Sequence, residues 1–130
     1  SPVADVVAIS AEVQADGGLL QGVALASAVN TGSASATTTE VDNGPSTANG
    51  GLFNLHVTAN TRDGATTIKV QDSADGSTWA DLITFTNVSA STTVGESITS
   101  TGTVNRYLRA EHTLAGASGS VTYHVSVARR

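Results

Sequence analysis

The chain has 130 residues and a net charge of −5, contains no cysteine, and is 39% hydrophobic but only 4% aromatic. This length suits a single domain, and the lack of cysteine excludes disulfides and thiolate metal sites. The negative charge, with Lys69 as the only lysine, argues against nucleic-acid binding, which requires clustered basic residues.

Charged residues make up 13% of the chain, against about a quarter in typical soluble domains. Much of the hydrophobic fraction is alanine, which buries little apolar area, so we expect a thin core. A thin core favours a protein that is stabilised partly by partners or by self-assembly. No apolar run approaches the ~20 residues that span a bilayer. We therefore expect no membrane partner, and we find no signal-peptide pattern.

The N-terminal third is compatible with more than one structure. Apolar residues alternate with polar ones over 7–13 and over 23–29, and Asp16-Gly17-Gly18 separates the two runs. The valines of residues 3–14 would also fit one face of a short helix, although their β-branched side chains favour a strand. Residues 1–18 are therefore expected to form a first hairpin strand, a short helix, or an arm that orders against a neighbouring subunit.

The middle of the chain alternates with period two, which predicts half-buried strands. Residues 42–51 are rich in turn formers and form a predicted loop, and an alternating strand follows at 53–59. Thr61-Arg62-Asp63-Gly64 reads as a turn before a second strand at 68–71. With a further strand at 79–85, these segments are expected to form a three-stranded meander.

The stretch from Val70 to Leu82 contains the only tryptophan, Trp79, and a tight turn at Asp75-Gly76. In the predicted strand at 79–85, Trp79 shares a face with apolar residues, although Asp81 interrupts that face. The alternation therefore predicts that Trp79 is a core anchor.

The C-terminal part repeats the pattern. Residues 87–102 read as a loop with possible short-strand contacts, and 104–113 as a strand whose facing the pattern leaves open. A Gly- and Ser-rich turn at 114–120 leads to a cleanly alternating strand at 121–127. About seven or eight strands with frequent turns predict one all-β domain over 1–130, an antiparallel β-sandwich or a jelly roll.

Three aspartates lie close together around Trp79. Asp72, Asp75 and Asp81 could supply the oxygen ligands that calcium prefers. Their spacing does not match a calcium-binding loop, and Asp and Ser also stabilise turns through their own side chains. Turn formation is therefore the favoured interpretation, and no cofactor is predicted.

The three histidines, His56, His112 and His124, fall on or near the polar faces of predicted strands. Zinc requires three or four converging ligands, and no close His spacing occurs. We therefore expect exposed strand histidines. The chain also contains no nucleophile-elbow, phosphate-loop or dinucleotide motif, so the sequence predicts a protein that is not an enzyme.

One segment carries a family resemblance. Val70-Gln71-Asp72-Ser73-Ala74-Asp75-Gly76-Ser77-Thr78-Trp79 resembles a hairpin of the form strand, Ser-x-Asp-Gly-x-x-Trp, strand in small β-sandwich virion proteins of tailed bacteriophages. The cysteine-free composition, rich in Ala, Thr, Ser and Gly, is similar to that of these proteins, which include capsid decoration (cement) proteins and tail components. The motif covers about a tenth of the chain, and similar hairpins occur in bacterial surface and carbohydrate-binding sandwiches.

The resemblance implies a non-enzymatic decoration protein that binds and stabilises the assembled phage head. Its partner would be the lattice of the major capsid protein, and the protein itself would be a homo-oligomer, with a trimer as one option. It would be made in the bacterial host cytoplasm and reside on the capsid surface. Two alternatives remain: a carbohydrate- or receptor-binding module with Trp79 or Tyr107 exposed, and a tail-tube or tail-terminator subunit.

The N-terminal segment and the basic C-terminal end are the expected contacts with that partner. The apolar N-terminal residues would complete their burial on the lattice, and the arginines would meet an acidic neighbour. The predicted contact residues are Val3, Val6, Val7, Ile9, Arg129 and Arg130.

Overall fold

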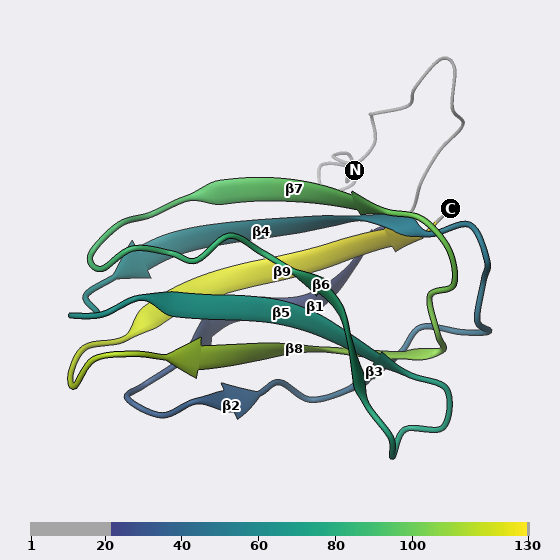
Figure 1. The fold of residues 1–130 in the computed structure, drawn as a ribbon, viewed down its shortest axis with the longest axis horizontal. Helices are drawn as coiled ribbons and strands as arrows, with labels where there is room; N and C mark the ends of the chain where they lie inside the picture. The colour runs from purple at the N-terminus through teal and green to yellow at the C-terminus, as the bar shows by residue number, and fades with distance from the viewer. Residues whose placement is uncertain (1–21, 130) are drawn as a thin grey trace, which may run out of the picture.

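The computed structural model describes residues 22–129, which form nine strands in two antiparallel sheets and contain no helix (Figure 1). The first sheet has the order β1 (Gly22–Asn30), β9 (Val121–Arg129), β4 (Gly51–Asn60), β7 (Gly95–Ser100). The second has the order β2 (Ala36–Thr37), β8 (Tyr107–Leu114), β5 (Thr66–Ser73), β6 (Ala80–Thr84), and β3 (Val41–Asp42) also pairs with β8. The predicted all-β sandwich is confirmed.

The core lies between the two sheets and is built by the alternation of their central strands. On β9 every second residue from Val121 to Val127 is buried, as the sequence predicted. Strand β8 turns Leu108 and Ala110 inward, which determines the facing that the sequence pattern left open. The largest apolar side chains that are fully buried in the core are Phe53, Leu55, Ile68, Phe85, Leu108 and Tyr123.

The predicted three-stranded meander is wrong. Strand β4 pairs with β7 and β9, whereas β5 pairs with β6 and β8, so the chain crosses from one sheet to the other after Asn60. Alternation indicates which face of a strand is buried, and it does not indicate which strand lies beside it. The hairpin of β5 and β6 is the part of the meander that the structure retains.

The connection between β4 and β5 is held by a buried arginine. Arg62 is only 2% exposed. Its guanidinium donates hydrogen bonds to the carbonyl oxygens of Ala115, Gly116 and Gly119 at 2.8–3.2 Å. The turn predicted at 61–64 is therefore a crossing point that ties β4 to the loop between β8 and β9.

Trp79 is not a core residue, and a β-bulge explains why. Strand β5 pairs Val70 with Ile83 but the next residue, Gln71, with Asp81, so Leu82 is an extra residue in β6. One extra residue reverses which side chains face the core. Ile83 is buried, while Asp81 is exposed and Trp79, just before β6, is only partly buried.

Candidate functional site

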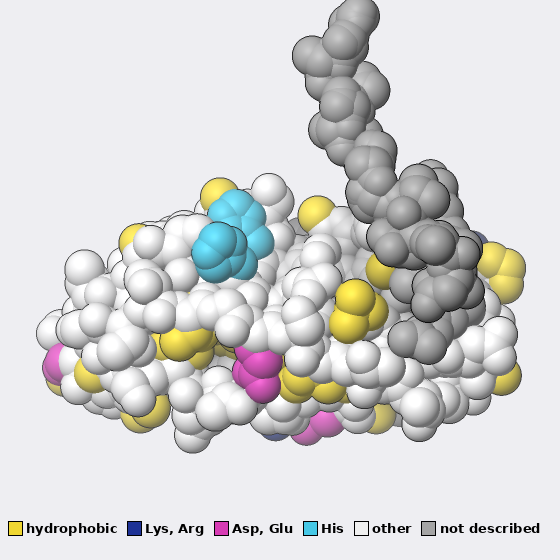
Figure 2. Space-filling model, turned by 90° about the horizontal axis from the view of Figure 1, so that it is seen from above, with side chains coloured by type: hydrophobic (Ala, Val, Ile, Leu, Met, Phe, Trp, Pro, Cys, Tyr) yellow, Lys and Arg dark blue, Asp and Glu magenta, His cyan; other side chains and the backbone are white. Residues whose placement is uncertain are grey.

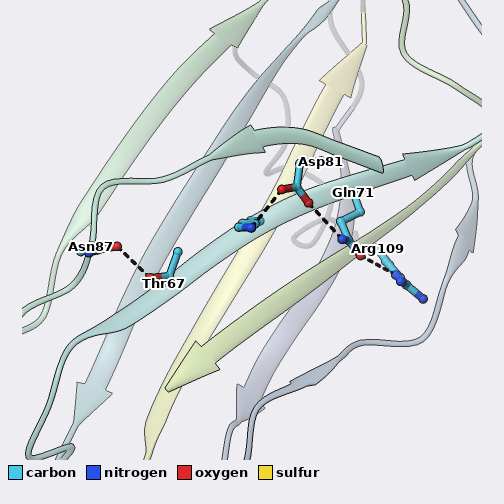
Figure 3. Close-up of polar contacts among 6 residues, drawn as sticks. Thr67, Gln71, Asp81, Asn87 and Arg109 are labelled. Atoms are coloured by element: carbon cyan, nitrogen blue, oxygen red, sulfur yellow. Dashed lines mark hydrogen bonds and ion pairs between the residues drawn. The ribbon is translucent and has the colours of Figure 1, made fainter. Parts of the chain in front are cut away.

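A chain of polar contacts crosses the outer face of the second sheet (Figure 3). Lys69 Nζ on β5 lies 2.9 Å from Asp81 Oδ2 on β6. Asp81 Oδ1 accepts a hydrogen bond from Gln71 Nε2 at 3.0 Å. The other end of the same amide, Gln71 Oε1, accepts a hydrogen bond from Arg109 Nε on β8 at 2.9 Å. The four side chains thus join three neighbouring strands.

The chain of contacts ends on the tryptophan. The guanidinium carbon of Arg109 lies 4.1 Å from the centre of the Trp79 ring, which places the cation over the ring face. Both side chains are partly exposed. We call Trp79, Arg109, Gln71, Asp81 and Lys69 the Trp79–Arg109 site.

A second arginine and aromatic pair lies at the start of β8. The guanidinium carbon of Arg106 is 5.1 Å from the Tyr107 ring centre. Asp42 accepts hydrogen bonds from Arg106 Nε at 2.8 Å and from Arg106 Nη2 at 2.7 Å. A carboxylate of the chain itself therefore occupies one edge of this guanidinium in the bidentate manner.

The ion pairs of this face shift the pKa values of their members. Hydrogen bonds from Gln71 and Lys69 lower the pKa of Asp81, and Asp81 in turn raises the pKa of Lys69. Arg106 is the main cause that lowers the pKa of Asp42 to about 2. These carboxylates therefore stay charged at neutral pH.

The three aspartates of the hairpin each have their own partners. Asp75 Oδ1 accepts hydrogen bonds from the backbone N–H groups of Ser77 and Thr78, which lower its pKa and close the turn. Gly76 adopts a φ of 79° there, as the Asp-Gly prediction requires. Asp72 Oδ2 instead accepts from the Asn105 N–H at 2.9 Å. Within residues 22–129, no group of three or more His, Cys, Asp or Glu side chains converges as a metal site.

The three histidines do not share one environment. His56 and His124 face each other across β4 and β9 with ring centroids 6.5 Å apart, and Figure 2 shows exposed histidine side chains side by side. His124 Nδ1 accepts a hydrogen bond from the N–H of Ala28, at a bulge of β1 where φ is 50°. His112 contradicts the predicted exposure, because β8 turns its ring into the core, where it is only 4% exposed.

Arg129 does not extend from the chain as a basic tip. Its two terminal nitrogens donate hydrogen bonds to the carbonyl oxygens of Pro45, Val104, Asn105 and Arg106. Burial lowers its pKa. The contact of Arg129 with an acidic partner stays a prediction, and within the chain this guanidinium is bonded to backbone carbonyls. The other predicted contacts lie outside the described residues: Val3, Val6, Val7, Ile9 and Arg130.

In comparisons with known proteins, no family model and no curated sequence matched the chain. In the part of the chain that the structure describes, no helix is long and apolar enough to cross a membrane.

Sequence reasoning missed Arg109 as a member of the site. The alternation over 104–113 left the facing of this strand open, so it gave no signal that Arg109 lies on the outer face. Its position over Trp79 depends on the pairing of β8 with β5 and on the bulge at Leu82, which single-sequence patterns do not encode.

Proposed function

We propose that the chain is a non-enzymatic structural protein of a tailed-phage particle that decorates and stabilises the assembled head. The hairpin resemblance and the sandwich fold support this role. The observation that carries the proposal is the outward position of Trp79 beneath Arg109. Trp and Arg are the residues most enriched at the energetic centres of protein interfaces, and a chain with one tryptophan places it on a sheet face rather than in its core.

The mechanism would be passive. A protein that binds the assembled lattice better than the free subunits stabilises the assembly by linkage. The outer face of β5, β6 and β8 would be one contact surface. The N-terminal residues Val3, Val6, Val7 and Ile9 would supply a second contact with the major capsid protein or with another copy of the chain. The protein would be made in the host cytoplasm and end on the capsid surface.

Electron microscopy of labelled particles tests the proposal. Particles released from the bacterial strain that carries the coding sequence are labelled with an antibody against the protein. Regular labelling of heads is the expected result. Labelling confined to tails would favour the tail-tube or tail-terminator alternative, and particles free of the protein would contradict a virion role.

A carbohydrate-binding module is the second candidate, because Trp79 and Tyr107 are both partly exposed beside polar side chains. Sugar rings stack on such aromatic faces. Arg109 counts against this role, since its guanidinium already covers one face of the Trp79 ring. Neutral glycans that quench the Trp79 fluorescence saturably would support the module, and unchanged emission across a glycan panel would exclude it.

A further inference from the structure

The positively charged side chains of residues 22–129 are all engaged within the chain except at one place. Lys69 is paired with Asp81, and Arg106 is paired with Asp42. The guanidinium groups of Arg62 and Arg129 are bonded to backbone carbonyls. Arg109 donates its Nε hydrogen to Gln71, and its two terminal nitrogens have no hydrogen-bond or ion-pair partner among the described residues.

Arg109 is also held in one orientation. Trp79 supports one face of the guanidinium, and Gln71 fixes its Nε edge. The Gln71 amide is itself oriented by Asp81, and Asp81 by Lys69 (Figure 3). A binding group that is oriented before its partner arrives loses less conformational entropy on binding. The network therefore presents the Nη1–Nη2 edge of Arg109 as a preorganised fork.

The neighbouring arginine shows which ligand such a fork takes in this protein. Arg106 lies over an aromatic ring as Arg109 does, and a carboxylate, that of Asp42, binds it through two short hydrogen bonds. Guanidinium and carboxylate groups match in this bidentate geometry. Arg109 repeats the arrangement of a cation on an aromatic ring without a carboxylate from the chain itself.

We propose that Arg109 on Trp79 is the binding site for an acidic side chain of a protein partner. A carboxylate suits the site better than a phosphate, because Glu111 lies opposite Lys69 on the same face and the chain carries a net charge of −5, which repels a dianion more strongly. A protein suits it better than a sugar, since Arg109 covers a face of the ring on which a sugar would stack. The choice of partner rests on the proposed function, whereas the carboxylate site itself does not.

NMR titration of the whole chain tests the site directly. The indole signal of Trp79, the only tryptophan, and the side-chain signals of Arg109 report on it. The probes are two matched tripeptides, acetyl-Gly-Glu-Gly-amide and acetyl-Gly-Gln-Gly-amide, together with galacturonate, galactose and inorganic phosphate at equal ionic strength. We expect saturable shifts of both sets of signals with the Glu peptide and none with the Gln peptide or galactose.

Three variants sharpen the result. Arg109→Gln removes the fork and should abolish the response, while Arg109→Lys keeps the charge and should weaken binding by about tenfold, the factor for one lost hydrogen bond to a charged group. Asp42→Asn empties the fork of Arg106, so the Arg106 signals should begin to respond to the Glu peptide. Unchanged folding of each variant is checked from the backbone amide signals.

Several outcomes would overturn the proposal. The first is the absence of a saturable shift with the Glu peptide, and the second is an unchanged shift in Arg109→Gln. The third is that galacturonate, galactose or phosphate binds more tightly than the Glu peptide does. A positive titration together with phage heads that lack the protein would retain the carboxylate site and reject the virion role. The two proposals can therefore fail separately.

Discussion

His112 Nδ1 lies 2.9 Å from the hydroxyl oxygen of Tyr123 inside the core, and the two rings meet edge to face. The opposite ring nitrogen, Nε2, lies 3.2 Å from the carbonyl oxygen of Ala34, which can only accept. The neutral ring with its hydrogen on Nε2 therefore satisfies both contacts, with the Tyr123 hydroxyl as donor to Nδ1. A second proton, on Nδ1, would force the Tyr123 hydroxyl to change from donor to acceptor in this contact.

This pair predicts acid sensitivity. Burial lowers the pKa of His112 in the folded protein, so the unfolded chain takes up the proton first as the pH falls. The contribution of His112 should reduce the free energy of unfolding as the pH falls below about 6.5, the ordinary histidine pKa, and this contribution should level off below the folded pKa. Urea unfolding between neutral and mildly acidic pH measures it. His112→Gln should flatten this dependence, whereas His56→Gln should not; equal slopes in all three proteins would refute the assignment.

Trp79→Ala should leave the fold almost as stable as before. The side chain lies on the outer face, so we expect a loss of less than about 1.5 kcal/mol, against about 3–5 kcal/mol for Phe85→Ala, whose side chain is 1% exposed. Both variants are compared by urea unfolding. Similar losses would mean that Trp79 anchors the core after all.

Arg62→Ala should destabilise the protein strongly. The substitution removes the donor to the carbonyls of Ala115, Gly116 and Gly119 and empties the space of a side chain that is only 2% exposed. We expect a loss of about 3 kcal/mol or more, together with faster amide exchange in the loop between β8 and β9. Arg62→Lys keeps the charge but provides a single donor group, so it should be intermediate. A variant Arg62→Ala within 1 kcal/mol of the wild type, the error of such comparisons, would contradict this role.

We expect Glu96 to protect the free edge formed by β7. Glu96 lies opposite the buried Leu55 of the neighbouring strand β4. Residues opposite each other point to the same side of a sheet, so the Glu96 side chain is directed toward the core. Its carboxylate accepts hydrogen bonds from the N–H and the hydroxyl of Thr86 at 2.8 and 3.0 Å. An inward charge on an edge strand discourages pairing with other chains. Glu96→Val should therefore increase light scattering with protein concentration, and Glu96→Gln should do so less; identical scattering of all three would argue against this protection.

The sequence predicted the parts of this fold that depend on local alternation. Strand β9 is the clearest case, since its four inward residues alternate without interruption. Alternation could not predict which strands lie beside β4 and β5. Each of these two strands buries one face, and a place in either sheet would satisfy that requirement. The burial of Arg62 could not be predicted for a similar reason. It lies in a segment with the composition of an exposed turn, and its hydrogen-bond partners are more than fifty residues away in the sequence.

The candidate site was predicted only in part. The hairpin and its Asp75-Gly76 turn follow from local chemistry. Asp81 interrupts the apolar face of the predicted strand, which indicated that the alternation does not hold over its whole length. A single bulged residue, Leu82, reverses the facing of the residues just before it, so Asp81 and Trp79 lie on the outer face. His112 was misplaced because an inward histidine with two polar partners has the same sequence pattern as an exposed one.

The binding of variants to phage heads most directly tests whether the outer face of β5, β6 and β8 is the attachment surface. Heads that lack the protein are mixed with wild-type chain, with Trp79→Ala, with Arg109→Gln, or with the double variant His56→Ala and His124→Ala on the opposite sheet. Sedimentation with the heads measures occupancy. An attachment surface on β5, β6 and β8 predicts that both variants of the Trp79–Arg109 site lose occupancy while the histidine variant attaches like the wild type. Full occupancy by Trp79→Ala and Arg109→Gln, or loss confined to the histidine variant, would contradict it.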